Sequence, residues 1–312
     1  MPDICILENY WHSYKSANAH LRNSYILAKE LGADLIQTRK DFKRNWNKKY
    51  EHIILAYGSH YMPHKEWLHY CVNNPDAQVY WLTNEYDIMW PLNTGWPDPR
   101  QAKAICNFEK KDKSHNFKRV ESYHTYDLNL LLARESNPLV EKKYDCIYYG
   151  TFRKDRSRYF ARYLQKPIYL STSIKNFKKY HHVGCRPNFI EPLQWKQGHE
   201  ILNKFRYSLY IEDAYTHEVY NHLANRFYEC LFCNVVQFFD IHCQNTIKRS
   251  GIEFDDFFYV RDHLELMDKI RSTNGSGFEE LNQRQQQWLP QSLKKRKRMI
   301  DALKKFIADQ RK

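Results

Sequence analysis

Short apolar runs alternate along the chain with segments whose apolar residues recur at helical spacing. The runs predict strands at 4–7, 34–38, 52–57, 78–82, 103–108, 146–149, 167–170, 207–211, 235–239 and 257–260. Helical periodicity appears between many of them, as at 17–31, 195–205, 222–231 and 263–271. Because strands that alternate with helices form mostly parallel sheets, this pattern predicts an α/β fold.

The pattern also predicts where the chain divides. At 312 residues it exceeds the usual size of one domain, and Pro138 with the charged run 141–143 interrupts the alternation. We therefore expect one α/β domain over 1–140 and a second over 141–289. The tail from about 284 to 312 is predicted as a basic amphipathic helix broken near Pro290, and its part 290–312 is expected to fold back across the joint and join the first domain. The segment 175–182 is predicted as a basic loop.

Charge and composition narrow the class of partner. The formal net charge is +13 and 16% of the residues are aromatic, which favours a polyanion such as nucleic acid or an anionic ligand such as a nucleotide. Cys230 and Cys233 lie in the apolar run ECLFCNVV and are interpreted as buried thiols in a reducing compartment rather than as metal ligands. The absence of a leader pattern or a long apolar segment predicts a soluble, intracellular protein.

A strand that runs into a glycine and then into several arginines occupies residues 145–158, DCIYYGTFRKDRSR. Gly150 releases the backbone into a turn, and Arg153, Arg156 and Arg158 follow where a helix begins. A helix start with unpaired N–H groups beside guanidinium groups suits phosphate oxygens. The alternative is an ordinary joint between strand and helix with a solvated basic face.

A second candidate site lies on the helix predicted at 222–231. Arg226 and Glu229 are three residues apart and project from one helical face. Such a pair is commonly a surface ion pair. After a strand end and near the arginine-rich loop, it also offers a fork for phosphates and acceptors for ribose hydroxyls.

Carboxylates that could act as a general base follow the strand at 78–82. Glu85 and Asp87 come after its apolar residues, where partial burial can raise a carboxyl pKa toward neutrality. The alternative is a turn that caps the next segment. The spacing of His12, His60 and His64 suits no metal triad, and no metal ligands are predicted. The motifs GxGxxG and GxxxxGK[ST] are absent, which argues against a dinucleotide dehydrogenase and a P-loop NTPase.

Taken in order, these segments resemble the DNA β-glucosyltransferases of T-even bacteriophages. The matching stretches are DCIYYGTFRKDRSR, NRFYECLFCNVVQFFD and FFYVRDHLELMDKI, with weaker agreement in YEHIILAYGSHYM and VYWLTNEYD. The resemblance implies a GT-B fold, in which two Rossmann-like domains face a central cleft. It also implies an inverting enzyme that moves a sugar from a UDP-sugar to the hydroxymethyl group of 5-hydroxymethylcytosine, flipped out of double-stranded phage DNA.

The resemblance assigns roles by position. Arg153 and Arg226 would hold the diphosphate, with the second loop arginine displaced to Arg156 or Arg158. Glu229 would bind the ribose hydroxyls and Ile190 would contact uracil, and Asp213 and Tyr215 would lie near the donor sugar. The base of the family is an Asp at the end of the fourth strand. Counting forward from the strand places Glu85 there and counting back from Pro91 places Asp87 there; Glu85 is preferred because it lies nearer the strand end.

The DNA-binding residues are expected in loops of the first domain, at His60, Tyr61, Lys65, Arg100 and Lys103. The donor would be UDP-glucose or a UDP-pentose, and assistance of UDP release by Mg²⁺ or Mn²⁺ is left open. The resemblance further implies a monomer in the cytoplasm of the infected bacterial host, without membrane contact. Two rival functions remain: a GT-B glycosyltransferase that acts on a glycan or small molecule, and a non-catalytic DNA-binding protein.

Overall fold

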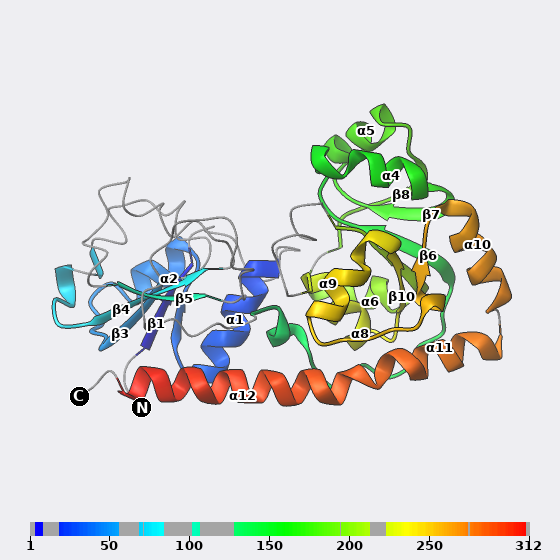
Figure 1. Ribbon diagram of the computed structural model, residues 1–312. Helices are drawn as coiled ribbons and strands as arrows, with labels where there is room; N and C mark the ends of the chain where they lie inside the picture. Colours follow the sequence, from blue (N-terminus) through cyan, green and yellow to red (C-terminus); the bar gives the residue numbers. More distant parts are fainter. Residues whose placement is uncertain are drawn as a thin grey trace. The chain divides into compact units, whose positions relative to one another are not determined.

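The computed structural model describes residues 4–8, 19–55, 69–70, 72–83, 102–106, 128–193, 195–212, 223–273 and 275–309. The chain divides into two compact units, residues 1–131 with 294–312 and residues 132–293. Each unit contains a sheet of its own, the first in blue and cyan and the second mainly in green and yellow in Figure 1. The described strands pair in parallel throughout.

The first unit contains a five-stranded sheet in the order β2-β1-β3-β4-β5. Its elements are β1 (Ile4–Leu7), α1 (Ala19–Leu31), β2 (Asp34–Ile36), α2 (Arg39–Arg44), β3 (His52–Leu55), β4 (Gln78–Thr83), β5 (Ala102–Cys106) and the 3-10 helix η3 (Leu128–Leu132). Cys5, Ile36 and Ile53 form a buried cluster with Tyr50 and Tyr70. The apolar runs of the sequence therefore supply the core of this sheet.

The second unit contains a six-stranded sheet in the order β11-β10-β9-β6-β7-β8. Its strands are β6 (Tyr144–Tyr149), β7 (Gln165–Ser171), β8 (Arg186–Ile190), β9 (Phe205–Tyr210), β10 (Val236–Asp240) and β11 (Tyr259–Val260). If the strands are numbered within the unit, this is the doubly wound order 3-2-1-4-5-6. The order in which successive strands are added to the sheet reverses between β6 and β9, which is the switch point. In such sheets ligands bind beyond the carboxyl ends of the strands at that switch point.

Helices connect these strands. They are η4 (Lys154–Arg156), α4 (Ser157–Tyr163), α5 (Ile174–His182), α6 (Trp195–Leu202), α8 (Asn225–Phe232), η5 (Ile241–Cys243), α9 (Gln244–Arg249), η6 (Asp256–Phe258), α10 (His263–Ser272) and α11 (Ser276–Gln286). The side chain of Gln285 on α11 forms two hydrogen bonds with the backbone at the start of β10. It accepts from the backbone N–H of Gln237 at 2.8 Å and donates to the carbonyl of Val235, the residue before the strand, at 2.8 Å. These two hydrogen bonds hold α11 against β10 of the same unit.

One sequence prediction about the second unit is wrong. Residues 175–182 form most of α5 rather than a loop: Ser173 caps the helix, and the buried Tyr180 lies six residues after Ile174. The five basic residues of this segment, Lys175, Lys178, Lys179, His181 and His182, concealed the helical spacing in the sequence. The predicted break in the tail helix near Pro290 is found at Gln287, between the end of α11 and the start of α12 (Trp288–Asp309). Pro290 lies in the first turn of α12, where its missing N–H costs nothing.

The helix α12 contributes to both units by sequence, since the second unit ends at Leu293. Within the first unit, Leu303, Phe306 and Ile307 are buried, and the Phe306 ring contacts Tyr80 of β4 with centroids 5.8 Å apart. Arg296 forms an ion pair with Glu30 of α1. No helix in the described part of the chain is long and apolar enough to span a membrane.

Candidate functional site

The switch point of the second sheet brings two strand ends together. β6 ends at Tyr149 and is followed by Gly150, while the neighbouring β9 ends at Tyr210 and is followed by Ile211 and Glu212. Gly150 has φ +155°, and its N–H donates to the Ser171 carbonyl at 3.2 Å. The strand ends just before Gly150, as the sequence predicts, and the segment that follows brings Arg156 to Glu212 at the end of β9.

Glu212 forms ion pairs with two arginines from different segments. Its Oε2 lies 3.0 Å from Arg156 Nη2, at the end of η4, and its Oε1 lies 3.4 Å from Arg226 Nη1, near the start of α8. The three side chains are 4%, 12% and 14% exposed, for Glu212, Arg156 and Arg226 respectively. Two cations and one anion therefore lie almost out of solvent at the switch point, where their interactions are screened less than at the surface.

Arg226 is held from several sides. Its Nη1 also donates to the Ile211 carbonyl at 2.8 Å, and its guanidinium lies over the rings of Tyr148 and Tyr210, 5.4 and 5.6 Å from their centroids. Burial alone would lower the pKa of Arg226, but Glu212 and the surrounding tyrosines raise it above its ordinary value. Arg226 thus remains a fixed cation, and its burial excludes the interpretation as a surface ion pair.

Glu229 lies one turn further along α8 and is 5% exposed. The Tyr149 hydroxyl donates to Glu229 Oε2 at 2.8 Å. Burial raises the pKa of Tyr149 well above its ordinary value, so the phenol keeps its proton and remains a donor. This bond orients a buried carboxylate at the switch point, beside the arginines.

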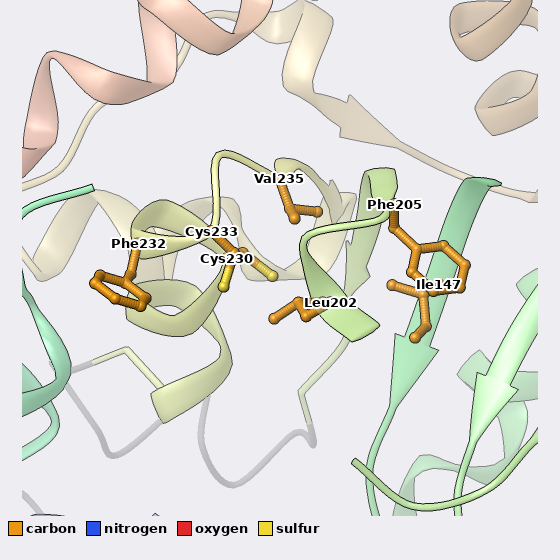
Figure 2. Close-up of a cluster of buried hydrophobic side chains, with 7 residues drawn as sticks. All are labelled: Ile147, Leu202, Phe205, Cys230, Phe232, Cys233 and Val235. Atoms are coloured by element: carbon orange, nitrogen blue, oxygen red, sulfur yellow. The ribbon is translucent and has the colours of Figure 1, made fainter. Parts of the chain in front are cut away.

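A buried hydrophobic cluster packs against Tyr149, the partner of Glu229. Figure 2 shows its buried side chains: Ile147, Leu202, Phe205, Cys230, Phe232, Cys233 and Val235. Tyr149 and Ile190 are partly buried against the same cluster. Burial raises the pKa of the Cys230 thiol to about 11, which leaves it protonated, and Cys146, Cys185 and Cys243 are likewise free and buried. The predicted uracil contact, Ile190, therefore belongs to the same cluster as Tyr149, the partner of Glu229.

The other two loop arginines are exposed. Arg153 precedes η4, and Arg158, on α4, donates to the Tyr159 hydroxyl at 2.7 Å with its guanidinium 4.7 Å from the ring centroid. The arginines of this loop therefore differ. Arg156 belongs to the buried charged cluster that it forms with Glu212 and Arg226, while Arg153 and Arg158 are exposed to solvent.

Most residues predicted for catalysis and DNA binding, and two predicted to bind the donor, lie outside the described residues. These are Glu85, Asp87, His60, Tyr61, Lys65, Arg100, Asp213 and Tyr215. Lys103 lies on β5, where its backbone pairs with Tyr80 of β4. At the switch point of the first sheet, the Ser24 hydroxyl donates to the buried Glu8 carboxylate at 2.7 Å, which places another acidic group at a strand end.

Two members of the site were not singled out from the sequence. Glu212 follows the apolar residues of β9, and Tyr149 was interpreted only as part of a buried strand. Tyr149 is the last residue of β6 and Glu212 the second residue after β9, and their places at the ends of the strands that flank a switch point are the signal that could have identified them. Among the described residues, no group of three or more His, Cys, Asp and Glu side chains is arranged to hold a metal ion.

Comparisons with known proteins bear on the fold. No protein-family model matches the chain, and no curated protein sequence matches it. Among solved structures, T4 phage β-glucosyltransferase in complex with UDP and Mn²⁺ has a TM-score of 0.71 at 18% identity, over 98% of this chain and 99% of that chain. The DNA-modifying enzyme β-glucosyltransferase, solved with and without uridine diphosphoglucose, has a TM-score of 0.70 at 19% identity over the same shares.

A more distant structure shares the fold. Anabaena HepE in complex with UDP and glucose has a TM-score of 0.59 at 9% identity, over 97% of this chain and 99% of that chain. The predicted α/β class is confirmed by the two parallel sheets, and the resemblance drawn from the sequence is confirmed at the level of the fold. The chain has the GT-B fold of the phage DNA β-glucosyltransferases.

Proposed function

We propose that the protein is a glycosyltransferase that takes a sugar from a UDP-sugar, and that the second unit binds this donor. The observation that carries the proposal is the pair of buried arginines, Arg156 and Arg226, at the switch point of a 3-2-1-4-5-6 sheet. Guanidinium groups in this position suit a diphosphate, because they form charge-assisted hydrogen bonds with its oxygens. The structural neighbours solved with UDP and UDP-glucose support the same ligand class.

The described residues can be given roles around such a donor. Arg226 and Arg156 would stabilise the negative charge that develops on the departing UDP, with the exposed Arg153 approaching the same phosphates. Glu229, held by Tyr149, would accept hydrogen bonds from the ribose hydroxyls. Ile190 would contact the uracil ring from the rim of the hydrophobic cluster.

For the acceptor we propose the hydroxymethyl group of 5-hydroxymethylcytosine in double-stranded DNA. The net charge of +13 and the structural similarity to a DNA-modifying enzyme support a polyanionic acceptor. Glu85, or Asp87 in its place, would remove the hydroxyl proton as the oxygen attacks the sugar. His60, Tyr61, Lys65, Arg100 and Lys103 would contact the DNA.

A glycan or small-molecule acceptor is the second candidate. The similarity to Anabaena HepE, solved with UDP and glucose, supports it, because a shared fold does not fix the acceptor. Binding and transfer assays separate these functions. The purified protein is titrated with UDP in the presence of Mg²⁺, Mn²⁺ or EDTA and then incubated with UDP-glucose or UDP-pentoses and hydroxymethylated DNA. UDP binding with sugar transfer to DNA supports the first function, and UDP binding with transfer only to a glycan supports the second.

A control variant tests whether the protein is an enzyme at all. Glu85→Gln should abolish transfer while UDP affinity is retained, and Asp87→Asn should do so if Asp87 is the base. If neither variant changes any measured property, including DNA binding, the catalytic role of both carboxylates is refuted.

A further inference from the structure

The carboxylate of Glu212 forms ion pairs with two arginines. It contacts Arg156 at 3.0 Å and Arg226 at 3.4 Å and is 4% exposed. Arg156 follows β6 and Arg226 lies on α8, so the ion pairs of Glu212 join segments that are 70 residues apart in sequence. The same guanidinium groups are the ones that suit a diphosphate.

The two oxygens of the Glu212 carboxylate do not have equally good partners. Among the described residues, Glu212 Oε1 is buried without a hydrogen bond, although it lies 3.4 Å from Arg226 Nη1. That nitrogen donates instead to the Ile211 carbonyl at 2.8 Å. The contact between Glu212 and Arg226 is therefore electrostatic without hydrogen-bond alignment, which leaves room for a better aligned acceptor oxygen to bind Arg226.

We infer that Glu212 is an internal counter-anion that competes with the donor diphosphate for Arg156 and Arg226. In the free protein it neutralises two buried cations that would otherwise lie close together without compensation. When a diphosphate binds the same arginines, the carboxylate and the phosphates repel one another, which weakens donor binding and favours release of UDP after transfer. This inference rests on the proposed donor site and adds a determinant of its affinity.

A role in positioning gives the opposite expectation. If Glu212 only orients the arginines, then its loss should let both side chains move and should weaken binding of any diphosphate. If it competes, removal of its charge with the shape retained should strengthen that binding. The sign of the change in affinity therefore separates the two roles.

The test uses calorimetric titration of the full chain and of Glu212→Gln with UDP, pyrophosphate and uridine. We expect Glu212→Gln to bind UDP and pyrophosphate at least tenfold more tightly, a change of about 1.4 kcal/mol, with uridine affinity unchanged. Asp145→Asn is the matched control, because Asp145 loses the same charge from an exposed pair with Arg206 on the same sheet, and it should change none of these affinities.

Glu212→Asp provides a second test should Glu212→Gln fail to fold. Its carboxylate is withdrawn by one methylene from both arginines, so UDP should bind more tightly than to the natural protein. Equal or weaker UDP binding by the folded variant overturns the inference while the donor site stands. If the natural protein binds no UDP, the proposed function fails, and pyrophosphate still decides: tighter binding by the variant supports competition, and no binding by either protein refutes it.

Discussion

Replacement of Arg226 by methionine tests the charged cluster most severely. Methionine keeps much of the apolar volume between the rings of Tyr148 and Tyr210 but removes the ion pair with Glu212 and the bond to the Ile211 carbonyl. Two charges 3.4 Å apart attract by about 5 kcal/mol at an effective dielectric constant of about 20. Desolvation offsets part of this attraction, and Arg156 remains to neutralise Glu212.

The net loss of stability should therefore lie at the lower end of the range for a broken buried ion pair, about 3 kcal/mol. Denaturation in urea, followed by circular dichroism, measures this loss as a shift of the midpoint with an unchanged slope. Affinity for UDP should fall by about 10- to 150-fold, because hydrogen bonds to a charged group contribute about 1.5–3 kcal/mol.

Arg206→Met is the matched control for this experiment. Arg206 lies on β9 and pairs with Asp145 at 3.0 Å, but the two side chains are 39% and 50% exposed. The same substitution should therefore cost less than about 1 kcal/mol and leave UDP affinity unchanged. Equal effects of the two substitutions on both stability and UDP affinity would refute a special role for the buried cluster.

Two further predictions concern a lysine and the ribose site. Burial lowers the pKa of Lys142, whose ammonium donates to the Cys233 carbonyl, from 10.5 to about 8. Between these values the unfolded chain holds the proton that the folded chain has lost, so this group should make stability rise with pH, by up to about 3 kcal/mol in all. Urea unfolding at pH 7.5 and 9.5 should show a rise that Lys142→Met removes, and identical pH dependence of the two proteins would contradict the shift. Glu229→Gln should reduce the ratio of the affinities for UDP and 2′-deoxy-UDP, measured by titration. An unchanged ratio would rule out the ribose contact.

The strands could be predicted because their buried residues form continuous apolar runs. The runs at 52–57 and 146–149 correspond to β3 and β6, since a strand covered on both faces needs apolar residues at nearly every position. The helix α5 was missed because its buried side, with Tyr180, is narrow and lysines and histidines surround it. The basic composition of this segment is typical of a solvent-exposed loop, whereas burial of Tyr180 against the rest of the unit holds it as a helix.

The site could be predicted only in part, for a related reason. Arg226 and Glu229 were identifiable because both lie on one turn of one helix, which sequence spacing reveals. The contacts of Glu212 with Arg156 and Arg226, and of Tyr149 with Glu229, join segments that only the sheet order brings together. Such contacts leave no local pattern in the sequence.

Sugar transfer to DNA tests the central claim most directly. The protein is incubated with a panel of UDP-sugars and DNA that contains either 5-hydroxymethylcytosine or cytosine, and the DNA is digested to nucleosides for mass spectrometry. We predict a hydroxymethylcytosine nucleoside heavier by one sugar residue with at least one UDP-sugar, and no change in cytosine DNA. Unmodified nucleosides with every UDP-sugar, from a protein that binds UDP, would contradict the proposed acceptor.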